Sequence, residues 1–85
     1  MNNRIGVISA ILEEPEKCQY EFNKIVSEYK DIIRGRMGIP FKEEKISVIS
    51  ITVVGSLDDI NSLTGKLGNL NNVIVKTSIS KKELE

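Results

Sequence analysis

The chain has 85 residues, of which 40% are hydrophobic and 28% are charged. Twelve Lys and Arg residues balance twelve Asp and Glu residues, so no net positive field favours a polyanion or an acidic membrane surface. These values are ordinary for a globular protein and argue against a general nucleic-acid binder. They predict one domain over residues 1–85, small enough that burial by a partner would help to stabilise it.

The first predicted strand is Arg4–Leu12, and it carries apolar side chains at both odd and even positions. A strand that is apolar on both faces belongs in the middle of a sheet, with material packed on each side. A helix is predicted over Glu16–Tyr29, where Pro15 suits the first turn and Cys18 lies on the apolar stripe. We therefore interpret Cys18 as a small buried hydrophobe rather than as a redox or ligand group.

The second predicted strand, Ile32–Ile39, has an apolar face and a basic face if its side chains alternate strictly. The apolar face then carries Ile33, Met37 and Ile39, and the basic face carries Arg34 and Arg36. Two glycines inside the strand indicate a bulge, or an edge strand that another backbone approaches closely. The two arginines either meet an anionic group or protect the sheet edge from stray pairing.

The strongest predicted strand is Ile46–Val54, which is β-branched, long and apolar on both faces. We expect it beside the first strand, at the centre of the sheet. Ser56 offers an N-cap for a helix over Leu57–Leu67, and Gly68 is expected to end that helix in a left-handed conformation. The last strand is predicted over Asn72–Ile79. The residues after it form a charged tail, so the ordered core is expected over about residues 4–80.

The order strand, helix, strand, strand, helix, strand is that of the ferredoxin-like, or split βαβ, plan. We predict an α+β sandwich in which a four-stranded antiparallel sheet, with strand order 4-1-3-2, carries both helices on one face. The helices leave the other face uncovered, although the central strands are apolar on that side too. Soluble monomers rarely expose such a face, so we expect a homodimer or homotetramer with a small-molecule ligand at the subunit interface.

The residues present give little support for catalysis or metal binding. Histidine is absent and Cys18 is the only cysteine, which excludes an intramolecular disulfide, a Ser–His or Cys–His pair and a paired-thiol copper site. Gly65-Lys66-Leu67-Gly68 resembles a phosphate loop, but Ile60 stands where that motif requires glycine, and no Ser or Thr follows Lys66. The central strands lack the aromatics of an RNA-recognition sheet. We expect no catalytic residues, no metal site and no cofactor.

The sequence predicts neither a leader nor a membrane segment. No charged segment followed by an apolar one precedes the first strand, and no apolar run approaches the ~18 residues that a membrane span needs. We therefore expect a cytoplasmic protein that does not associate with membranes.

Two stretches of the chain resemble a small bacterial family. The first is Arg36-Met37-Gly38-Ile39-Pro40-Phe41-Lys42-Glu43-Glu44, and the second, after an apolar strand, is Leu63-Thr64-Gly65-Lys66-Leu67-Gly68. The family is that of the iron-only hydrogenase system regulators, ACT-like domains similar to the C-terminal domain of the nickel-responsive regulator. The resemblance extends over nearly the whole chain, from Arg4 to Ser80.

The resemblance implies a stand-alone ACT-like regulatory domain. Met1–Asn3 leaves no room for the ribbon-helix-helix arm of the nickel-responsive regulator, and the nickel-binding histidines are missing. We therefore expect neither autonomous DNA binding nor nickel sensing. ACT domains often bind amino acids near the loop after the first strand, which is Glu13-Glu14-Pro15 in this chain.

We predict a non-enzymatic regulatory or ligand-sensing domain linked to the iron-only hydrogenase system. Arg36, Lys66 and Glu14 are the predicted ligand-binding residues, the first two for an anionic group. Two alternatives stay open. In the first, the chain is a structural adaptor whose edge strand Ile32–Ile39 adds to another protein's sheet. In the second, the oligomer binds DNA through a basic face.

Overall fold

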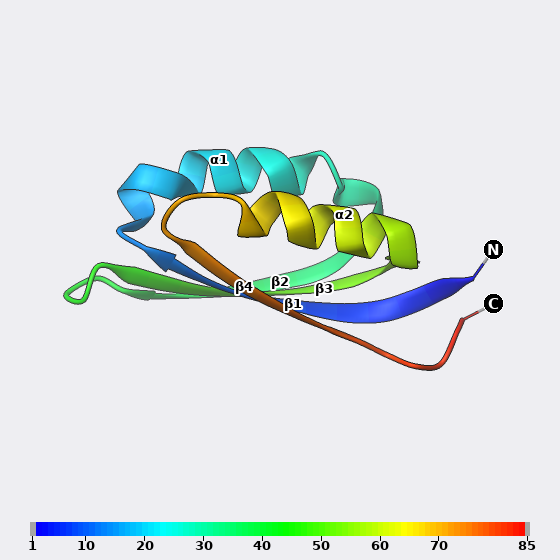
Figure 1. Ribbon diagram of the computed structural model, residues 1–85. Coiled ribbons are helices and arrows are strands. Elements are labelled where there is room, and N and C mark those ends of the chain that lie inside the picture. Colours follow the sequence, from blue (N-terminus) through cyan, green and yellow to red (C-terminus); the bar gives the residue numbers. More distant parts are fainter. Residues whose placement is uncertain (1, 85) are drawn as a thin grey trace.

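A computed structural model of the chain describes residues 2–84. Its elements are β1 (Asn3–Glu13), α1 (Pro15–Ser27), a short 3-10 turn η1 (Lys30–Ile32), β2 (Ile33–Phe41), β3 (Ile46–Ser56), α2 (Leu57–Gly68) and β4 (Val73–Ile79). Both helices lie above one face of the sheet, and the other face is left uncovered (Figure 1). The predicted order of strands and helices is confirmed, and each element ends within two residues of its expected bounds.

The sheet has the order β2-β3-β1-β4, and every neighbouring pair is antiparallel. This is the predicted 4-1-3-2 order counted from the opposite edge, so the ferredoxin-like α+β sandwich is confirmed. β1 pairs with β3 without interruption from Asn3↔Ser56 to Glu13↔Ile46. The two strands that are apolar on both faces therefore occupy the centre of the sheet, as their pattern predicts.

The hydrophobic core fills the space between the sheet and the two helices. Its buried side chains are Ile8, Ala10 and Leu12 of β1, Cys18, Phe22 and Val26 of α1, Ile49, Ile51 and Val53 of β3, Ile60, Leu63 and Leu67 of α2, and Val73 of β4. The central strands β1 and β3 each contribute alternate residues, because successive side chains of a strand point to opposite faces. The remaining apolar residues of the central strands consequently point away from the helices.

A β-bulge interrupts β2 near its start. Ile33 pairs with Val53 and Gly35 pairs with Thr52, so Arg34 is an extra residue in the ladder. The predicted bulge is confirmed, but the predicted common face for Ile33 and Met37 is wrong. Because the bulge shifts the alternation by one residue, Ile33 packs against the core whereas Met37 lies on the uncovered face.

The ends of α2 confirm one expectation and correct another. Ser56 is the N-cap, and its hydroxyl accepts the backbone N–H of Asp59 at 3.1 Å. Gly68 does not adopt the predicted left-handed conformation; no glycine in the described residues has a positive φ. The chain instead passes through a right-handed Asn69 and turns at Asn72, which has a φ of 69°. Asparagine tolerates this region better than most residues do, so the turn falls four residues later than predicted.

Candidate functional site

The uncovered side of the sheet, which we call the open face, carries one aliphatic residue from each strand in a single row. Ile39 of β2 pairs with Val48 of β3, Val48 with Ile11 of β1, and Ile11 with Ile74 of β4. We call these four residues the apolar row. Ile39 and Ile74 are both 49% exposed and Ile11 is 38% exposed. The row therefore crosses the entire sheet without a polar interruption.

The open face collects most of the exposed apolar side chains of the described chain. Seven of the nine large hydrophobic residues that are exposed lie there: Ile5, Val7, Ile11, Met37, Ile39, Phe41 and Ile74. Beside the apolar row, the short side chains of Ser9 and Ser50 pair at the centre of the sheet. Exposed apolar side chains scattered singly need no explanation, but a contiguous set on one face marks an interaction surface.

The exposed area of the molecule is large for its mass. A compact monomer of 9.5 kDa is expected to expose about 5,000 Å², whereas this chain exposes 5760 Å². The difference is close to the ~800 Å² that each partner buries in a standard protein interface. The chain therefore exposes more surface than a compact monomer of its mass is expected to expose.

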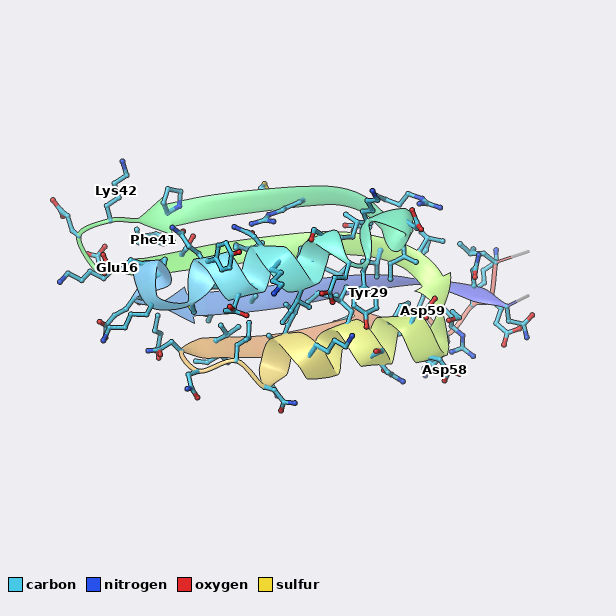
Figure 2. The ribbon with its side chains drawn as sticks, turned by 90° about the horizontal axis from the view of Figure 1, so that it is seen from above. Glu16, Tyr29, Phe41, Lys42, Asp58 and Asp59 are labelled. Atoms are coloured by element: carbon cyan, nitrogen blue, oxygen red, sulfur yellow. The ribbon has the colours of Figure 1, made fainter. Side chains whose placement is uncertain are left out.

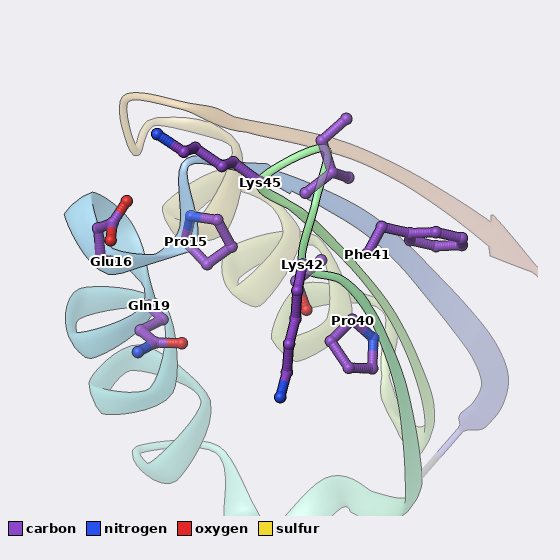
Figure 3. Close-up of a pocket in the computed structure, with 9 residues that line it drawn as sticks. Pro15, Glu16, Gln19, Pro40, Phe41, Lys42 and Lys45 are labelled. Carbon is purple, nitrogen blue, oxygen red and sulfur yellow. The ribbon is translucent and has the colours of Figure 1, made fainter.

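A groove lies at the end of the molecule where β1 leads into α1. It has a volume of about 260 Å³ and is lined by Pro15, Glu16, Gln19, Pro40, Phe41, Lys42, Lys45, Ile46 and Ser47. One wall is the first two turns of α1, and the other is the hairpin between β2 and β3 (Figure 3). Among residues 2–84, neither Lys42 nor Lys45 has a carboxylate within ion-pair distance. The groove therefore combines apolar walls with two lysines that form no ion pair in the described residues and with one acid, Glu16.

Backbone hydrogen bonds join three turns at this end of the molecule. The N–H of Glu13 donates to the carbonyl of Asn72 at 2.7 Å, and the N–H of Glu14 donates to the carbonyl of Lys45 at 2.8 Å. Glu14, Lys45 and Asn72 are also the three non-glycine residues with positive φ in the described chain. A left-handed conformation costs such residues roughly 1–2 kcal/mol each. The structure thus concentrates its backbone strain in the turns around the groove.

Cys18 lies beneath these turns in the core. Its Sγ is 4.0 Å from the carbonyl oxygen of Glu13 and 3.9 Å from that of Asn72. Burial raises the pKa of the Cys18 thiol, which disfavours the reactive thiolate. The interpretation of Cys18 as a buried hydrophobe is confirmed.

Two of the predicted ligand residues, Glu14 and Arg36, lie beside different parts of α1. Glu14 precedes the helix, and its Oε1 lies 3.0 Å from Nζ of Lys17. Arg36 reaches the middle of α1 from β2, where its Nη2 donates to Oδ1 of Asn23 at 2.7 Å and its guanidinium lies 5.7 Å from the Phe22 ring centroid. Arg36 is therefore on the helix side of the sheet and braces the edge strand against α1.

Lys66, the third predicted residue, joins the two helices at the other end of α1. Its Nζ lies 3.9 Å from Oε1 of Glu28 and 5.1 Å from the ring centroid of Tyr29. The Tyr29 hydroxyl is 2.7 Å from the Ser62 hydroxyl. The hydrogen bond with Ser62, and then the Lys66 ammonium, lower the pKa of Tyr29, and the hydrogen bond with Tyr29 raises the pKa of Lys66.

The structure therefore does not bring the three predicted residues together. A helix of 13 residues is about 20 Å long, and Glu14 and Lys66 lie at its opposite ends. Figure 2 shows the length of α1 from above, with Glu16 at the start of the helix and Tyr29 just beyond its end. The groove lysines were not predicted as site residues, although Lys42 belongs to the first stretch that carries the family resemblance.

Comparison with known proteins places the chain in a family. The model of the TM1266-like family, "Iron-only hydrogenase system regulator, putative", matches residues 4–77. The chain belongs to the TM1266-like family. This confirms the family expected from the two stretches around Arg36 and Lys66.

One solved structure of this family is "The structure of uncharacterized protein TM1266 from Thermotoga maritima". Its sequence is 30% identical, the match covers 93% of this chain and 99% of that chain, and the TM-score is 0.88. No curated protein matches the chain. The TM1266-like assignment supports a regulatory role and agrees with the fold seen here.

Two further observations on residues 2–84 bear on the site. None of the helices in this part of the chain has the length and apolar character needed to cross a bilayer. The same residues contain no cluster of three or more His, Cys, Asp or Glu side chains that could hold a metal ion. The open face and the groove are therefore the surfaces on which a functional proposal can be built.

Proposed function

We propose that this TM1266-like protein is a non-enzymatic, cytoplasmic regulatory domain of the iron-only hydrogenase system. It acts as a symmetric homo-oligomer, a dimer or tetramer, whose subunits pair through their open faces and which responds to a small ligand at the subunit interface. The observation that carries the proposal is the apolar row from Ile39 to Ile74, which crosses all four strands and is exposed at Ile39, Ile11 and Ile74. Covering this row removes apolar surface from water, which is the main driving force of association.

The open face has the dimensions of a protein interface. Four strands about 4.8 Å apart and about 25–35 Å long present roughly 500–700 Å² in projection. Side-chain relief brings the accessible area near the ~800 Å² per partner of a standard interface. A two-fold axis through the face would place the same apolar row on both subunits, as an isologous interface requires.

The chemistry of the open face also fits a partner surface. Ser9 and Ser50 lie at its centre, where short side chains let another sheet approach closely. Lys76 and Glu13 are the charged residues at open-face positions of β1, β3 and β4, and both are at exposed margins of the sheet. Charges kept away from the middle of an apolar surface are typical of interfaces.

The proposal is tested by the mass of the protein in solution, measured by light scattering over a range of concentrations. The mass of the wild-type chain is expected to be that of a dimer or tetramer. Ile11→Asp, in the apolar row, should shift the mass to that of the folded monomer. Tyr20→Asp is the control, because Tyr20 is 75% exposed on α1 and lies away from the open face. A wild-type monomer at all concentrations would rule the proposal out.

A second candidate function, that of an adaptor, is favoured by the edge strand β2. Eight of its nine residues are exposed. A Cβ on Gly35 would meet nothing within 4 Å, and one on Gly38 would meet Ile49 only at 3.9 Å, so packing within the chain explains neither glycine. A strand from another protein could pair with this edge. Affinity purification from the native host discriminates: a stoichiometric partner that binds without any ligand favours the adaptor.

A further inference from the structure

The open face carries two charges of opposite sign, on opposite sides of the apolar row. Lys76 of β4 pairs with Ser9, which lies two residues before Ile11 in β1. Glu13 lies two residues after Ile11 in the same strand. In the described chain these are the charged residues at open-face positions of β1, β3 and β4. The apolar row therefore runs between a basic position and an acidic one.

Neither charge has a partner of opposite sign within the described chain. Ser9, which marks the position of Lys76 along the sheet, is four residues from Glu13. That separation is about 13 Å at the rise of a β-strand, so Lys76 and Glu13 do not meet in one subunit. Both side chains are exposed, and neither forms an ion pair among residues 2–84. A partner that covers this face satisfies both charges if it supplies an acid opposite Lys76 and a base opposite Glu13.

A second copy of the chain supplies both charges in one orientation. When two sheets meet face to face, the two-fold axis that relates them lies between the sheets and parallel to them. An axis along the apolar row lays this row on the same row of the other copy. The positions on one side of the row then cover the positions on its other side. Lys76 consequently lies one strand spacing, about 4.8 Å sideways, from Glu13 of the partner subunit, and the symmetry repeats this contact.

The same charges disfavour two other symmetric orientations. Lys76 shares its row across the sheet with Met37, and Glu13 pairs with Ile46. An axis along the row of Lys76 would place the two copies of this lysine against each other. An axis along the strands, between β1 and β3, would place Lys76 against the partner subunit's Met37 and Glu13 against the partner subunit's Ile46. Like charges repel, and a charge covered by apolar side chains loses water without gaining a partner.

We propose that two copies of the chain stack with their apolar rows superposed, so that Lys76 of each copy pairs with Glu13 of the other. This inference rests on the proposed association through the open faces, to which it adds the orientation of the subunits and the residues that set it. The orientation also brings Met37 over the partner subunit's Phe41, which places one exposed apolar side chain on another. Ion pairs at the rim of an interface fix its register and exclude other pairings.

The orientation is tested by charge reversal in the full chain, with the mass measured by sedimentation equilibrium. Glu13→Lys and Lys76→Glu should each weaken self-association by about tenfold or more, because each variant places like charges at both contacts. An equimolar mixture of the two variants should recover the wild-type mass, since a dimer with one copy of each has unlike charges at both contacts. Glu21→Lys and Lys24→Glu are the matched controls, because both residues are exposed on α1. These controls should associate like the wild type.

The remaining outcomes separate this inference from the association itself. A wild-type oligomer that is disrupted by Ile11→Asp but weakened by neither charge reversal would reject the orientation and retain the open face as the interface. A mixture that stays dissociated would also reject the orientation. Lys76→Gln should weaken association, and a stronger association would instead indicate that the two copies of Lys76 face each other. A wild-type monomer at all concentrations would reject the association and the orientation together.

Discussion

The backbone N–H of Glu14 donates to the carbonyl of Lys45 at 2.8 Å, and both residues are left-handed, with φ of 54° and 57°. This bond joins the β1–α1 turn to the β2–β3 hairpin, which are the two segments that enclose the groove. The position of one wall relative to the other is therefore fixed by backbone rather than by flexible side chains. A groove formed in this way can discriminate by shape even though it lies at the surface.

The strain at Glu14 can be measured by substitution. Glu14→Val is expected to lower the free energy of unfolding by about 1–2 kcal/mol, because a β-branched residue is disfavoured at positive φ. Glu14→Gly should be close to the wild type or more stable, since glycine adopts this conformation freely and the exposed ion pair with Lys17 contributes little. Urea denaturation followed by circular dichroism gives both values. A valine variant as stable as the wild type would show that residue 14 does not need a left-handed backbone in the folded chain.

Two glycines make opposite predictions for alanine substitution. A Cβ on Gly55 would lie 2.8 Å from Cγ2 of Ile32, so Gly55→Ala should cost about 1–3 kcal/mol through overpacking. A Cβ on Gly65, inside α2, would meet nothing within 4 Å, and Gly65→Ala should stabilise the protein by about 0.4–1 kcal/mol. Thermal melts of the two variants provide the comparison. Changes of the melting temperature with the same sign in both variants would contradict the packing at these glycines.

The contact between Lys66 and Tyr29 predicts a pH-dependent signal. The pKa of Tyr29 is lowered by its hydrogen bond with Ser62 and by the Lys66 ammonium, so its ionisation stabilises the folded chain as pH rises through the folded pKa toward the unfolded value. Lys66→Met should raise the midpoint of Tyr29 ionisation. Ultraviolet absorbance of the phenolate follows this titration, with Tyr20→Phe used to isolate the Tyr29 signal. An unchanged midpoint would show that Lys66 does not act on Tyr29.

Burial of Cys18 predicts a protected thiol. Cys18 is only 4% exposed, and burial raises the pKa of its thiol. A thiol-specific reagent should therefore react with it at least about tenfold more slowly than with free cysteine. The reaction rate should follow the fraction of molecules in which local unfolding exposes the thiol. Denaturant should restore the fast reaction. Rapid modification of the native protein would place Cys18 on an accessible surface and contradict the packing beneath the β1–α1 turn.

Local patterns in the sequence predicted the fold because alternation and helical periodicity depend on neighbouring residues. Ile8 and Ile11 lie on opposite faces of β1, which follows from counting positions alone. The glycines of β2 indicated a bulge or an edge strand, but neither the position of the bulge at Arg34 nor its effect on the alternation of the strand followed from them, so Ile33 was assigned to the wrong face.

The groove could not be predicted in the same way. Its walls come from segments about 25 residues apart along the chain, and neither Glu14 nor Lys45 carries a sequence signal for a left-handed backbone. The prediction of Arg36, Lys66 and Glu14 relied on charge within motifs. Charge alone does not say whether a side chain already has a partner within the chain. In the structure Arg36 is hydrogen-bonded to Asn23, and Lys66 is close to the carboxylate of Glu28 and the ring of Tyr29.

The central claim is that two copies of this chain meet through their open faces. Isotope-filtered NMR on a mixture of labelled and unlabelled protein tests it most directly, because it detects only contacts between subunits. We predict intermolecular nuclear Overhauser effects among the methyl groups of Ile11, Ile39 and Ile74. Intermolecular contacts confined to the β2 edge, or their absence in a sample with the mass of a monomer, would contradict the claim.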